Sequence, residues 1–383
     1  MKKYLTFTYY VVFFAAQASF LPFIVMFYQE LGFNGTQIGL LSGVIPLVTL
    51  VAVPLWTRLA DATRKHWLIM NVALSVGVVG IFIFPMFRAF APLLVLGVVI
   101  NIFMSPVSSF ADSATMFMLG DQKDQYGRIR IGGTIGYGVM APIAGLLVEN
   151  LGLKIAFWGA AILFFVGLLT SQKFEYAVGR EEDSERGSVL TLLGNPHWLL
   201  FLSLAFASGL SIAATGMYFY PYMKELGLKE SMMGLTVTVA TLAELPTFFF
   251  GNRLLKRFGS YGLFLVAMVM NGVRPILFAI SGSVIPILLI QLLNVLAFPA
   301  MWLAGVAYAD EHAPDNLKTT AQGLFGTMVF GVGMAMGGFF GGVLLESIGG
   351  QGMFGIFGVV VLGVTILAAL IKRGLSAEIG SDK

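Results

Sequence analysis

The feature that most limits how this chain can fold is a series of long apolar stretches that carry almost no charge. A helix that crosses a bilayer needs about 20 mostly apolar residues, and twelve such stretches follow one another along the 383 residues. They cover residues 6–29, 36–57, 67–87, 91–118, 128–149, 154–171, 198–223, 231–251, 261–281, 284–309, 319–345 and 351–371. Since lipid offers the backbone no hydrogen-bond partners, each stretch is predicted to be helical. The predicted fold class is an all-α membrane protein with twelve transmembrane helices.

Composition excludes several other classes of protein. Charged residues make up 11% of the chain, against about 25% in soluble domains, which excludes an ordinary soluble enzyme. The chain has no Cys, and its three His are far apart in sequence, so we predict no metal site. No Walker A, HExxH or GxSxG pattern occurs, and we therefore expect no cofactor and no enzymatic activity. The net charge of +3 comes from scattered basic residues, which argues against a nucleic-acid partner.

The positive charges predict how the chain crosses the membrane. With the N-terminus placed in the cytoplasm, 18 of the 23 Lys and Arg residues fall in cytoplasmic segments and four in outer segments, while Arg274 lies within a span. Basic residues accumulate on the cytoplasmic side of membrane proteins. We therefore expect a multi-pass protein of the cell inner (plasma) membrane with both termini in the cytoplasm.

The two halves of the chain resemble each other. Three short segments recur at offsets of 194 to 198 residues, in the same places relative to the spans: Phe110–Asp112 with Tyr308–Asp310, Leu147–Gly152 with Leu344–Gly349, and Arg58–Lys65 with Asn252–Gly259. Parallel repeats of this kind are related by an axis along the membrane normal. We predict two pseudo-symmetric six-helix bundles at 1–171 and 197–373, a cytoplasmic linker at 172–196 and a cytoplasmic tail at 374–383.

The chain resembles the major facilitator superfamily over nearly its whole length. The turn after the second span has Asp61, followed by Arg64 and Lys65, although Thr57 stands where the superfamily pattern has Gly. Gly127–Arg130 at the start of span five and Glu346–Gly352 after span eleven are similar to the lactose-permease, phenylpropionate-permease and nucleoside-symporter branches. The resemblance implies the major facilitator fold and secondary active transport by alternating access around a central cavity. It also implies that Asp61, Arg64, Lys65 and Arg128 act in gating.

Four charged residues are predicted to lie in the lipid zone: Asp112, Arg130, Glu244 and Arg274. A charged side chain in mid-bilayer costs about 2.5–3.5 kcal/mol on insertion scales, so such residues face a protein interior or a wet cavity. We predict proton coupling at Glu244 and Asp112, with Arg274 as a partner that itself stays protonated. The alternative, for Glu244 with Arg274 and for Asp112 with Arg130, is an ion pair between helices that has only a structural role.

A second set of residues is predicted to bind the solute. Asp112 and Arg130 lie on neighbouring spans, and an arginine–carboxylate pair suits sugar hydroxyls. Thr134 and Tyr137 follow Arg130 on the same helix, and the resemblance places Tyr137 at a sugar-stacking position. Further candidates are Glu244, Thr247, Gln17, Asn101, Asn294 and Trp302.

The sequence also departs from the lactose-permease branch. By spacing, spans seven, ten and eleven carry uncharged residues where that branch has its charged coupling cluster: Ile212, Thr215, Asn294, Ala297 and Phe330. Any proton coupling must therefore depend on Glu244 or Asp112. In addition, the glycines at 333, 337 and 341 form a small-residue seam that suits contacts between the halves or ordinary helix packing.

Two classes of function remain open. The first is transport, with proton-coupled uptake of a small polar solute such as a sugar or oligosaccharide by a monomer as the leading version. A proton-coupled nucleoside or aromatic-acid symporter and a proton-driven exporter of drugs or metabolites are its alternatives. The second class is a transport-inactive receptor or a membrane-embedded enzyme, for which the loops are short.

Overall fold

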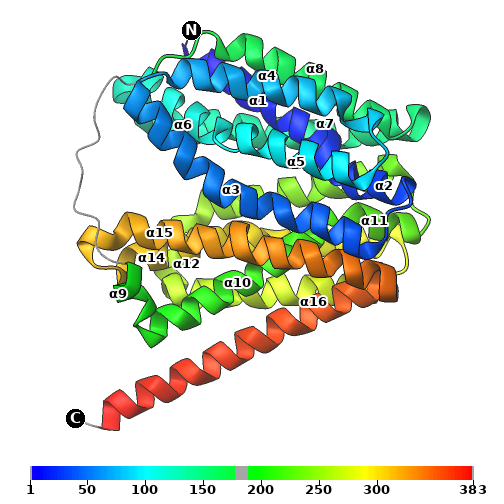
Figure 1. The fold of residues 1–383 in the computed structure, drawn as a ribbon. Coiled ribbons are helices and arrows are strands. Elements are labelled where there is room, and N and C mark those ends of the chain that lie inside the picture. The colour runs from blue at the N-terminus through cyan, green and yellow to red at the C-terminus, as the bar shows by residue number, and fades with distance from the viewer. Residues whose placement is uncertain (1, 177–188, 382–383) are drawn as a thin grey trace. The chain divides into compact units, whose positions relative to one another are not determined.

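The computed structural model describes residues 2–176 and 189–381, and within these ranges the chain is helical, with no β-strand. Contacts divide the chain into two units (Figure 1). Unit 1 comprises Met1–Glu181 with Gly227–Thr241, and unit 2 comprises Glu182–Leu226 with Leu242–Lys383. The predicted linker lies largely at 177–188, outside the described residues.

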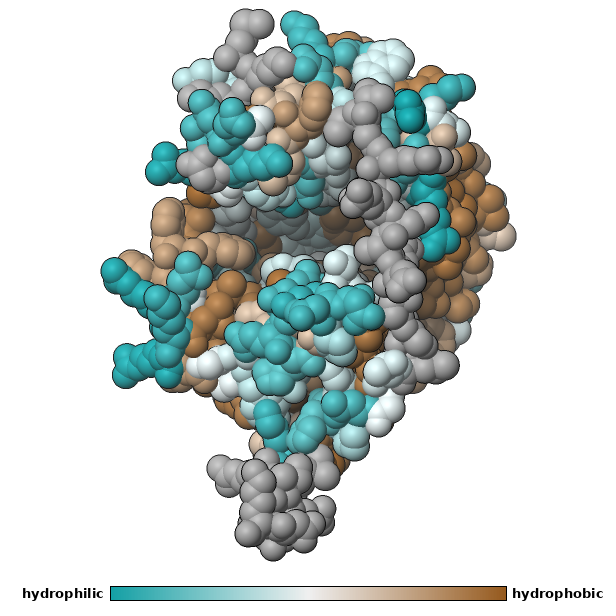
Figure 2. Space-filling view, turned by 90° about the vertical axis from the view of Figure 1, so that its left-hand side faces the viewer, coloured by the Kyte–Doolittle hydropathy of each residue, from teal (hydrophilic) through white to brown (hydrophobic). Residues whose placement is uncertain are grey.

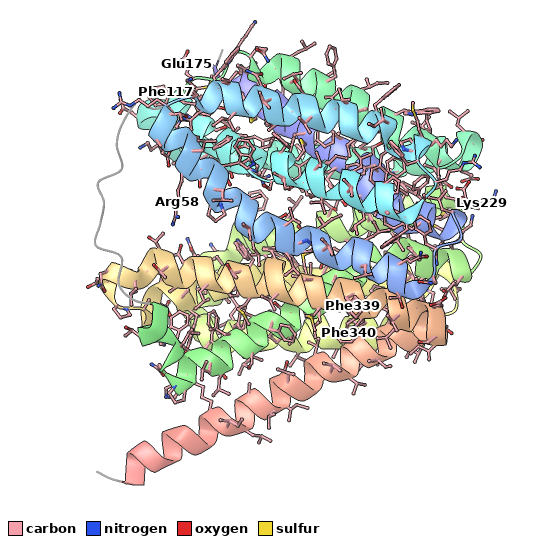
Figure 3. The ribbon with its side chains drawn as sticks, viewed as in Figure 1. Arg58, Phe117, Glu175, Lys229, Phe339 and Phe340 are labelled. Atoms are coloured by element: carbon pink, nitrogen blue, oxygen red, sulfur yellow. The ribbon has the colours of Figure 1, made fainter. Side chains whose placement is uncertain are left out.

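Unit 1 is a bundle of long helices joined by short turns. Its elements are α1 (Lys2–Phe20), η1 (Leu21–Phe23), α2 (Ile24–Glu30), α3 (Gly35–Thr63), α4 (His66–Ile83), η2 (Phe84–Met86), α5 (Phe90–Met104), α6 (Val107–Leu119), η3 (Gly120–Gln125), α7 (Tyr126–Leu151) and α8 (Lys154–Ser171). The first part of α12, up to Thr241, also belongs to this unit. In Figure 3, Arg58, Phe117 and Glu175 lie at one end of the unit and Lys229 at the other.

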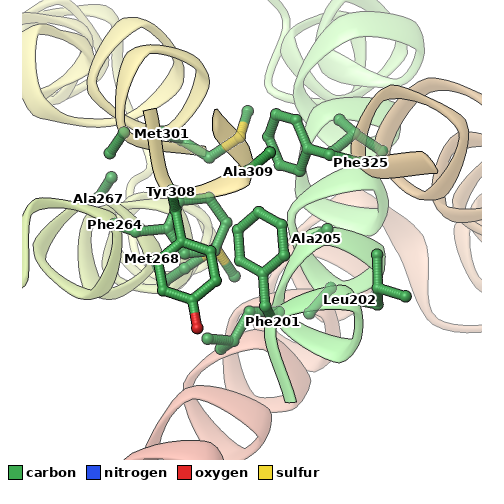
Figure 4. Packing of buried hydrophobic residues seen from close by; sticks show 14 of the residues in the cluster. Phe201, Leu202, Ala205, Phe264, Ala267, Met268, Met301, Tyr308, Ala309 and Phe325 are labelled. Carbon is green, nitrogen blue, oxygen red and sulfur yellow. The ribbon is translucent and has the colours of Figure 1, made fainter. Parts of the chain in front are cut away.

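Unit 2 is built in the same way. Its elements are α9 (Val189–Leu193), α10 (Pro196–Met217), α11 (Phe219–Glu225), the rest of α12 (Glu230–Ala279), α13 (Val284–Leu292), η4 (Leu293–Leu296), α14 (Phe298–His312), η5 (Asp315–Leu317), α15 (Lys318–Gly326), the π-helical η6 (Thr327–Gly333) and α16 (Met334–Ser381). Its core packs Phe201 against Phe264, Tyr308 and Phe325 at centroid distances of 4.5 to 5.3 Å (Figure 4).

The helices account for the predicted spans. Ten helices among the described residues are long and apolar enough to cross a membrane. Two of the ten, over Glu230–Ala279 and Asp315–Lys372, are each long enough for two crossings, and each contains a glycine with positive φ, Gly259 or Gly349. Counted as two spans each, they bring the total to the predicted twelve.

The turns repeat between the halves. Positive φ occurs at three pairs of positions separated by 195, 195 and 197 residues: Gly32 and Gly227, Arg64 and Gly259, Gly152 and Gly349. Arg64 is the one non-glycine residue with positive φ in the described part of the chain. The structure thus carries the internal repeat that the sequence offsets indicate.

Breaks within spans also recur. Pro22 sits in η1, where the first span changes from α1 to α2, and Tyr218 separates α10 from α11 at the corresponding place in span seven. Span four breaks between α5 and α6, where Pro106 precedes Val107. Span ten breaks at η4, before Pro299 in α14. Proline removes a backbone donor and crowds the preceding turn, which explains the breaks in spans one, four and ten.

Large apolar side chains cover much of the surface of both units. Phe249, Ile285 and Val359 are 71%, 67% and 63% exposed. Figure 2 shows hydrophilic residues gathered on the face toward the viewer and hydrophobic residues along its flank. An apolar surface of this extent would be unfavourable in water but is expected in contact with acyl chains. The surface therefore agrees with a membrane-spanning chain.

The glycine seam packs helices within unit 2. A Cβ atom on Gly337 would lie 2.6 Å from the Cβ of Ala213, and one on Gly333 would lie 2.9 Å from the Cα of Gly209. The seam thus lets η6 and α16 approach α10, the helix packing that was one of the two expected uses. Phe339 and Phe340, in the same stretch of α16, pack edge to face at 5.4 Å (Figure 3).

We predict that Gly337→Leu lowers the stability of the purified protein by about 2 kcal/mol, because it overfills the α10–α16 contact. Gly363→Leu is the matched control, since a Cβ on Gly363 has nothing within 4 Å. Thermal unfolding in detergent would show a lower Tm for the first variant and an unchanged or higher Tm for the second. Equal Tm values for the two variants would contradict the packing argument.

Candidate functional site

The predicted Asp112–Arg130 pair is present in unit 1. Arg130 Nε on α7 lies 3.7 Å from Asp112 Oδ1 on α6. The hydroxyl of Tyr10 on α1 donates to the same Asp112 oxygen at 2.5 Å, and Thr115 Oγ1 lies 3.3 Å from the Tyr10 hydroxyl. Three helices therefore meet at one carboxylate. The Asp112 and Arg130 side chains are 36% and 34% exposed, so both remain open to a ligand.

Aromatic rings hold Arg130 in place. Its guanidinium carbon lies 4.4 Å from the Phe14 ring centroid and 5.0 Å from that of Tyr10. Cation–π contacts of this kind orient a guanidinium group without using its N–H donors. Because the contact with Asp112 is long and made through Nε, the planar donor face of Arg130 is not saturated by that carboxylate.

Glycines on α7 make this arrangement possible. A Cβ on Gly133 would lie 2.8 Å from both Arg130 Nη1 and Phe14 Cδ2, and one on Gly136 would lie 2.0 Å from the Val11 carbonyl oxygen. Larger residues at these positions would push α7 away from α1. The close approach therefore depends on small residues directly beside the arginine.

Thr134 and Tyr137 lie on α7, about one and two turns after Arg130, and both are half-buried. Their spacing keeps them near the arginine's side of the helix. Their role in binding stays a prediction.

A second polar cluster lies in unit 2 and joins Glu244 to Arg274 through amides. Asn294 Nδ2 donates to Glu244 Oε1 at 2.9 Å, and Arg274 Nη1 donates to Asn294 Oδ1 at 2.7 Å. Arg274 Nη2 donates to Gln291 Oε1 at 2.8 Å. Arg274, Asn294 and Gln291 are buried, whereas Glu244 is half-buried. Glu244 is therefore the accessible end of a buried chain of hydrogen bonds.

Asn294 stands between the acid and the base. The sequence predicts Arg274 as the partner of Glu244, and the structure shows an indirect partnership, with no ion pair between the two within the described residues. Arg274 Nε is buried and has no hydrogen-bond partner in this part of the chain. The guanidinium is thus hydrogen-bonded to neutral amides. The carboxyl group that balances its charge, Glu244, lies on the far side of Asn294.

The break in span ten positions this cluster. Asn294 lies in η4, and the following Ala297 has φ −92° and ψ −98°, so α13 does not continue directly into α14. Thr247, three residues after Glu244 on α12, donates its hydroxyl to the Val295 carbonyl. A broken helix in lipid needs such partners for its freed backbone groups. The segment of α12 that carries Glu244 therefore also supplies a hydrogen bond to the backbone at the break in span ten.

Sequence reasoning missed Tyr10 and Gln291. Gln291 lies three residues before Asn294, on the same helical face of an otherwise apolar span, and that spacing could have revealed it. Tyr10 lies seven residues before Gln17, again on one face. Its role could not be read from sequence, because twelve Tyr residues occur in the chain and its partner is 102 residues away.

The predicted gating residues lie at the turn between α3 and α4 and at the start of α7. Asp61 Oδ1 lies 2.9 Å from His66 Nε2, a contact that sequence reasoning missed. Arg64 has φ 56° at the C-cap of α3, and Arg64, Lys65 and Arg128 are exposed. Their role in gating stays a prediction.

The remaining candidates divide between a cavity and the core. Gln17 and Asn101 line a cavity inside unit 1. Trp302 packs against Phe325 and Phe330 at centroid distances of 5.3 and 5.2 Å, at the edge of the core cluster of unit 2. No group of three or more His, Cys, Asp or Glu that could hold a metal occurs among the described residues.

Comparison with known proteins decides the family. Residues 4–356 match the MFS_1-like family. The chain belongs to this family. Its helical fold and repeat agree with that membership and with the predicted major facilitator resemblance.

Several relatives match nearly the whole chain. Maltose permease of Geobacillus stearothermophilus is 28% identical over 98% of this chain and 95% of its own length. A relative from Escherichia coli (strain K12), named a probable 3-phenylpropionic acid transporter, is 22% identical over 92% of this chain and 93% of its own. These relatives are transporters, and this chain is a multi-span membrane transporter rather than an enzyme.

Solved structures share the fold. The crystal structure of the nucleoside transporter NupG superposes with a TM-score of 0.83 and 16% identity over 97% of this chain and 99% of NupG. A bacterial homologue of the human lysosomal transporter Spinster, in an inward-facing and unoccupied conformation, superposes with a TM-score of 0.71 and 13% identity over 96% of this chain and 95% of its own. At these identities the likeness concerns the fold alone.

We predict that Asn294→Ala destabilises the protein by about 3 kcal/mol, because it leaves both Arg274 and Glu244 without their shared partner in a buried site. Asn150→Ala is the control, since Asn150 is exposed and its side chain bonds the carbonyl of Leu146 in its own helix. Thermal unfolding in detergent should show a marked loss of Tm for the first variant only. A wild-type Tm for Asn294→Ala would show that the network contributes little.

Proposed function

We propose that this transporter couples the uptake of a small polar organic solute to protons, with Glu244 as the proton carrier. The observation that carries the proposal is the half-buried Glu244 carboxyl group, linked through Asn294 to the buried charge of Arg274. A carboxyl group in this position can bind and release a proton at the accessible end of the network. The guanidinium stays protonated, so the carboxyl group is the member of the network that can exchange a proton.

The solute would be held at Asp112 and Arg130 in unit 1. A carboxylate accepts from hydroxyl groups, and an unsaturated guanidinium donates to them or to an acid. This donor and acceptor set suits a sugar or oligosaccharide, and the similarity to maltose permease supports that class. Thr134, Tyr137, Gln17, Thr247 and Trp302 are the further residues proposed to contact the solute.

The relatives also support an alternative solute class. One is named for 3-phenylpropionic acid, and another, from Escherichia coli, is named xanthosine permease. Arg130 would pair with the carboxylate of an aromatic acid, and Asp112 would accept from ribose hydroxyls. Export driven by protons is the remaining alternative, and the direction of the proton-linked flux distinguishes it from uptake.

The proposal includes a cellular arrangement. The protein works as a monomer in the cell inner (plasma) membrane, with both termini in the cytoplasm. Six-helix bundles at 1–171 and 197–373 would rock about the solute, and Asp61, Arg64, Lys65 and Arg128 would act in the cytoplasmic gate. The support is the bias of basic residues and the repeated turns.

We expect Glu244→Gln to abolish accumulation of solute against a gradient while solute exchange continues. The glutamine carbonyl can still accept from Asn294, but the side chain can no longer release a proton. Proteoliposomes loaded for counterflow, and separately given a pH gradient, would be tested with labelled maltose, 3-phenylpropionate and xanthosine. Glu30→Gln at the exposed end of α2 is the matched control. Undiminished uphill uptake by Glu244→Gln would rule out Glu244 as the carrier.

We expect Arg130→Lys to weaken solute binding by about tenfold or more, since lysine keeps the charge but loses the planar donor pair. The stability of this variant should change little, because the cation–π contacts tolerate an ammonium group. Binding measured by titration calorimetry, together with the Tm, would separate the two effects. Wild-type affinity in a folded Arg130→Lys variant would remove Arg130 from the binding site.

A further inference from the structure

Unit 1 contains a cavity lined by phenylalanine rings together with leucine, isoleucine and methionine side chains. Its volume is about 250 Å³, and it lies among α1, α4, α5 and α8 of this one unit. Five rings line it: Phe13, Phe20, Phe84, Phe157 and Phe164. The cavity is therefore formed within a single bundle of helices.

The rings support one another and keep the cavity open. Phe13 and Phe20 each pack against Phe164, at centroid distances of 5.6 and 6.2 Å. Phe157 stacks on Phe84 at 5.4 Å with an interplanar angle of 12°. All five of the lining rings are buried at 8% exposure or less. Interlocked rings of this kind form a preformed apolar wall, as small-molecule sites usually have.

A few polar groups interrupt the apolar wall. Asn101 Nδ2 donates to the Gly97 carbonyl at 2.9 Å, and Ser105 Oγ to the Ile102 carbonyl at 3.2 Å. Gln17 and Ser108 also line the cavity, and both side chains are half-buried. Their amide and hydroxyl groups can form hydrogen bonds with a ligand in the cavity.

The size and chemistry of the cavity select the ligand. A cavity of about 150 Å³ takes up benzene, so this larger one suits a substituted or bicyclic ring. A sugar ring carries hydroxyl groups around its whole edge, and most of them would face apolar side chains without a hydrogen bond, at a cost of about 1–3 kcal/mol each. A planar aromatic ring with one or two polar edge groups fits both the wall and the amide.

Two helices, α1 and α6, contribute residues both to the cavity and to the Asp112–Arg130 pair or its contacts. Ser108, which lines the cavity, lies one turn before Asp112 on α6. On α1, Phe13 lines the cavity while the adjacent Phe14 stacks on Arg130. One helical turn is about 5.4 Å, the length of a short linker between a ring and a polar tail.

We infer that the cavity is the ring subsite of the transported solute, which is a small aromatic or heteroaromatic compound whose polar tail reaches Asp112 and Arg130. The inference rests on the proposed transport function and, for the solute, selects the aromatic-acid or nucleoside alternative over the sugar class. Aryl carboxylates and nucleosides share this chemistry, a flat ring joined to a hydrogen-bonding tail, and the sugar class lacks it.

Gly97 offers a direct test, because it lines the cavity and its absent Cβ would meet only Ile45 Cδ1, at 3.9 Å. Gly97→Leu places a side chain into free space, whereas Gly97→Ala adds one methyl group. Binding of 3-phenylpropionate, xanthosine and maltose to the purified full-length protein would be measured by calorimetry and thermal shift. Gly363→Leu, at an open position of α16, is the matched control.

We expect an aromatic probe to bind the wild type, Gly97→Ala and Gly363→Leu, and to lose about tenfold or more of its affinity in Gly97→Leu. Gln17→Met, which keeps the volume and removes the amide, should weaken xanthosine more than 3-phenylpropionate. Binding by 3-phenylpropionate alone assigns an aryl acid, and binding by xanthosine alone assigns a nucleoside. Unchanged aromatic binding in a folded Gly97→Leu variant, or binding by maltose alone, would overturn the inference.

The ring subsite and proton coupling can fail separately. Gly97 lies in unit 1 and Glu244 in unit 2, so variants at the two positions test the two proposals separately. If the Gly97→Leu variant still takes up maltose against a gradient, the ring subsite is rejected and proton coupling remains supported. The opposite outcome is also possible: Gly97→Leu blocks binding of the aromatic probe, while Glu244→Gln still accumulates solute. That result would support the ring subsite and reject proton coupling at Glu244.

Discussion

The constraint on which the structure depends is that a peptide group in lipid has no water to bond. Because of this constraint the described chain is helical. Wherever a helix is interrupted, other groups must form hydrogen bonds with the freed backbone N–H and C=O groups. In span ten the interruption at η4 is satisfied by the Thr247 hydroxyl on the Val295 carbonyl. The same segment presents Asn294 to Glu244 and Arg274. Polar chemistry therefore gathers where the helix breaks, because a break already demands polar partners.

The two arginines of the polar clusters, Arg130 and Arg274, are held in different ways, and the difference separates their proposed roles. Arg274 is buried and bonded to the neutral amides of Asn294 and Gln291, which fix it tightly. Arg130 is held by ring faces and a long contact to Asp112, and it stays about one-third exposed. A guanidinium positioned by rings keeps its donors for a ligand, whereas one saturated by amides acts on its neighbours through charge.

Much of this arrangement could be predicted from the sequence. The spans follow from apolar length, and the repeat of short motifs anticipates the repeated positive-φ turns such as Gly152 and Gly349. The Asp112–Arg130 pair was predictable because the two residues lie on consecutive spans joined by a short turn. The link between Glu244 and Arg274 was predicted, but not its form, since an amide from a third segment stands between them. Spacing along one helix carries no information about which residue of another helix fills that gap.

The sequence by itself determined that this is a helical membrane protein with twelve spans and two similar halves. It also determined that the charged side chains within the spans face the protein interior. The reason is that charged groups, and backbone groups without hydrogen bonds, are unfavourable in lipid. The tertiary structure decided which partners those charges have. Tyr10 reaches Asp112 across 102 residues, and phenylalanines from α1, α8 and η2 close around one cavity. These contacts depend on how each helix is rotated about its axis and on how closely helices approach at glycines such as Gly136. A linear pattern of apolar residues determines neither the rotation nor the distance.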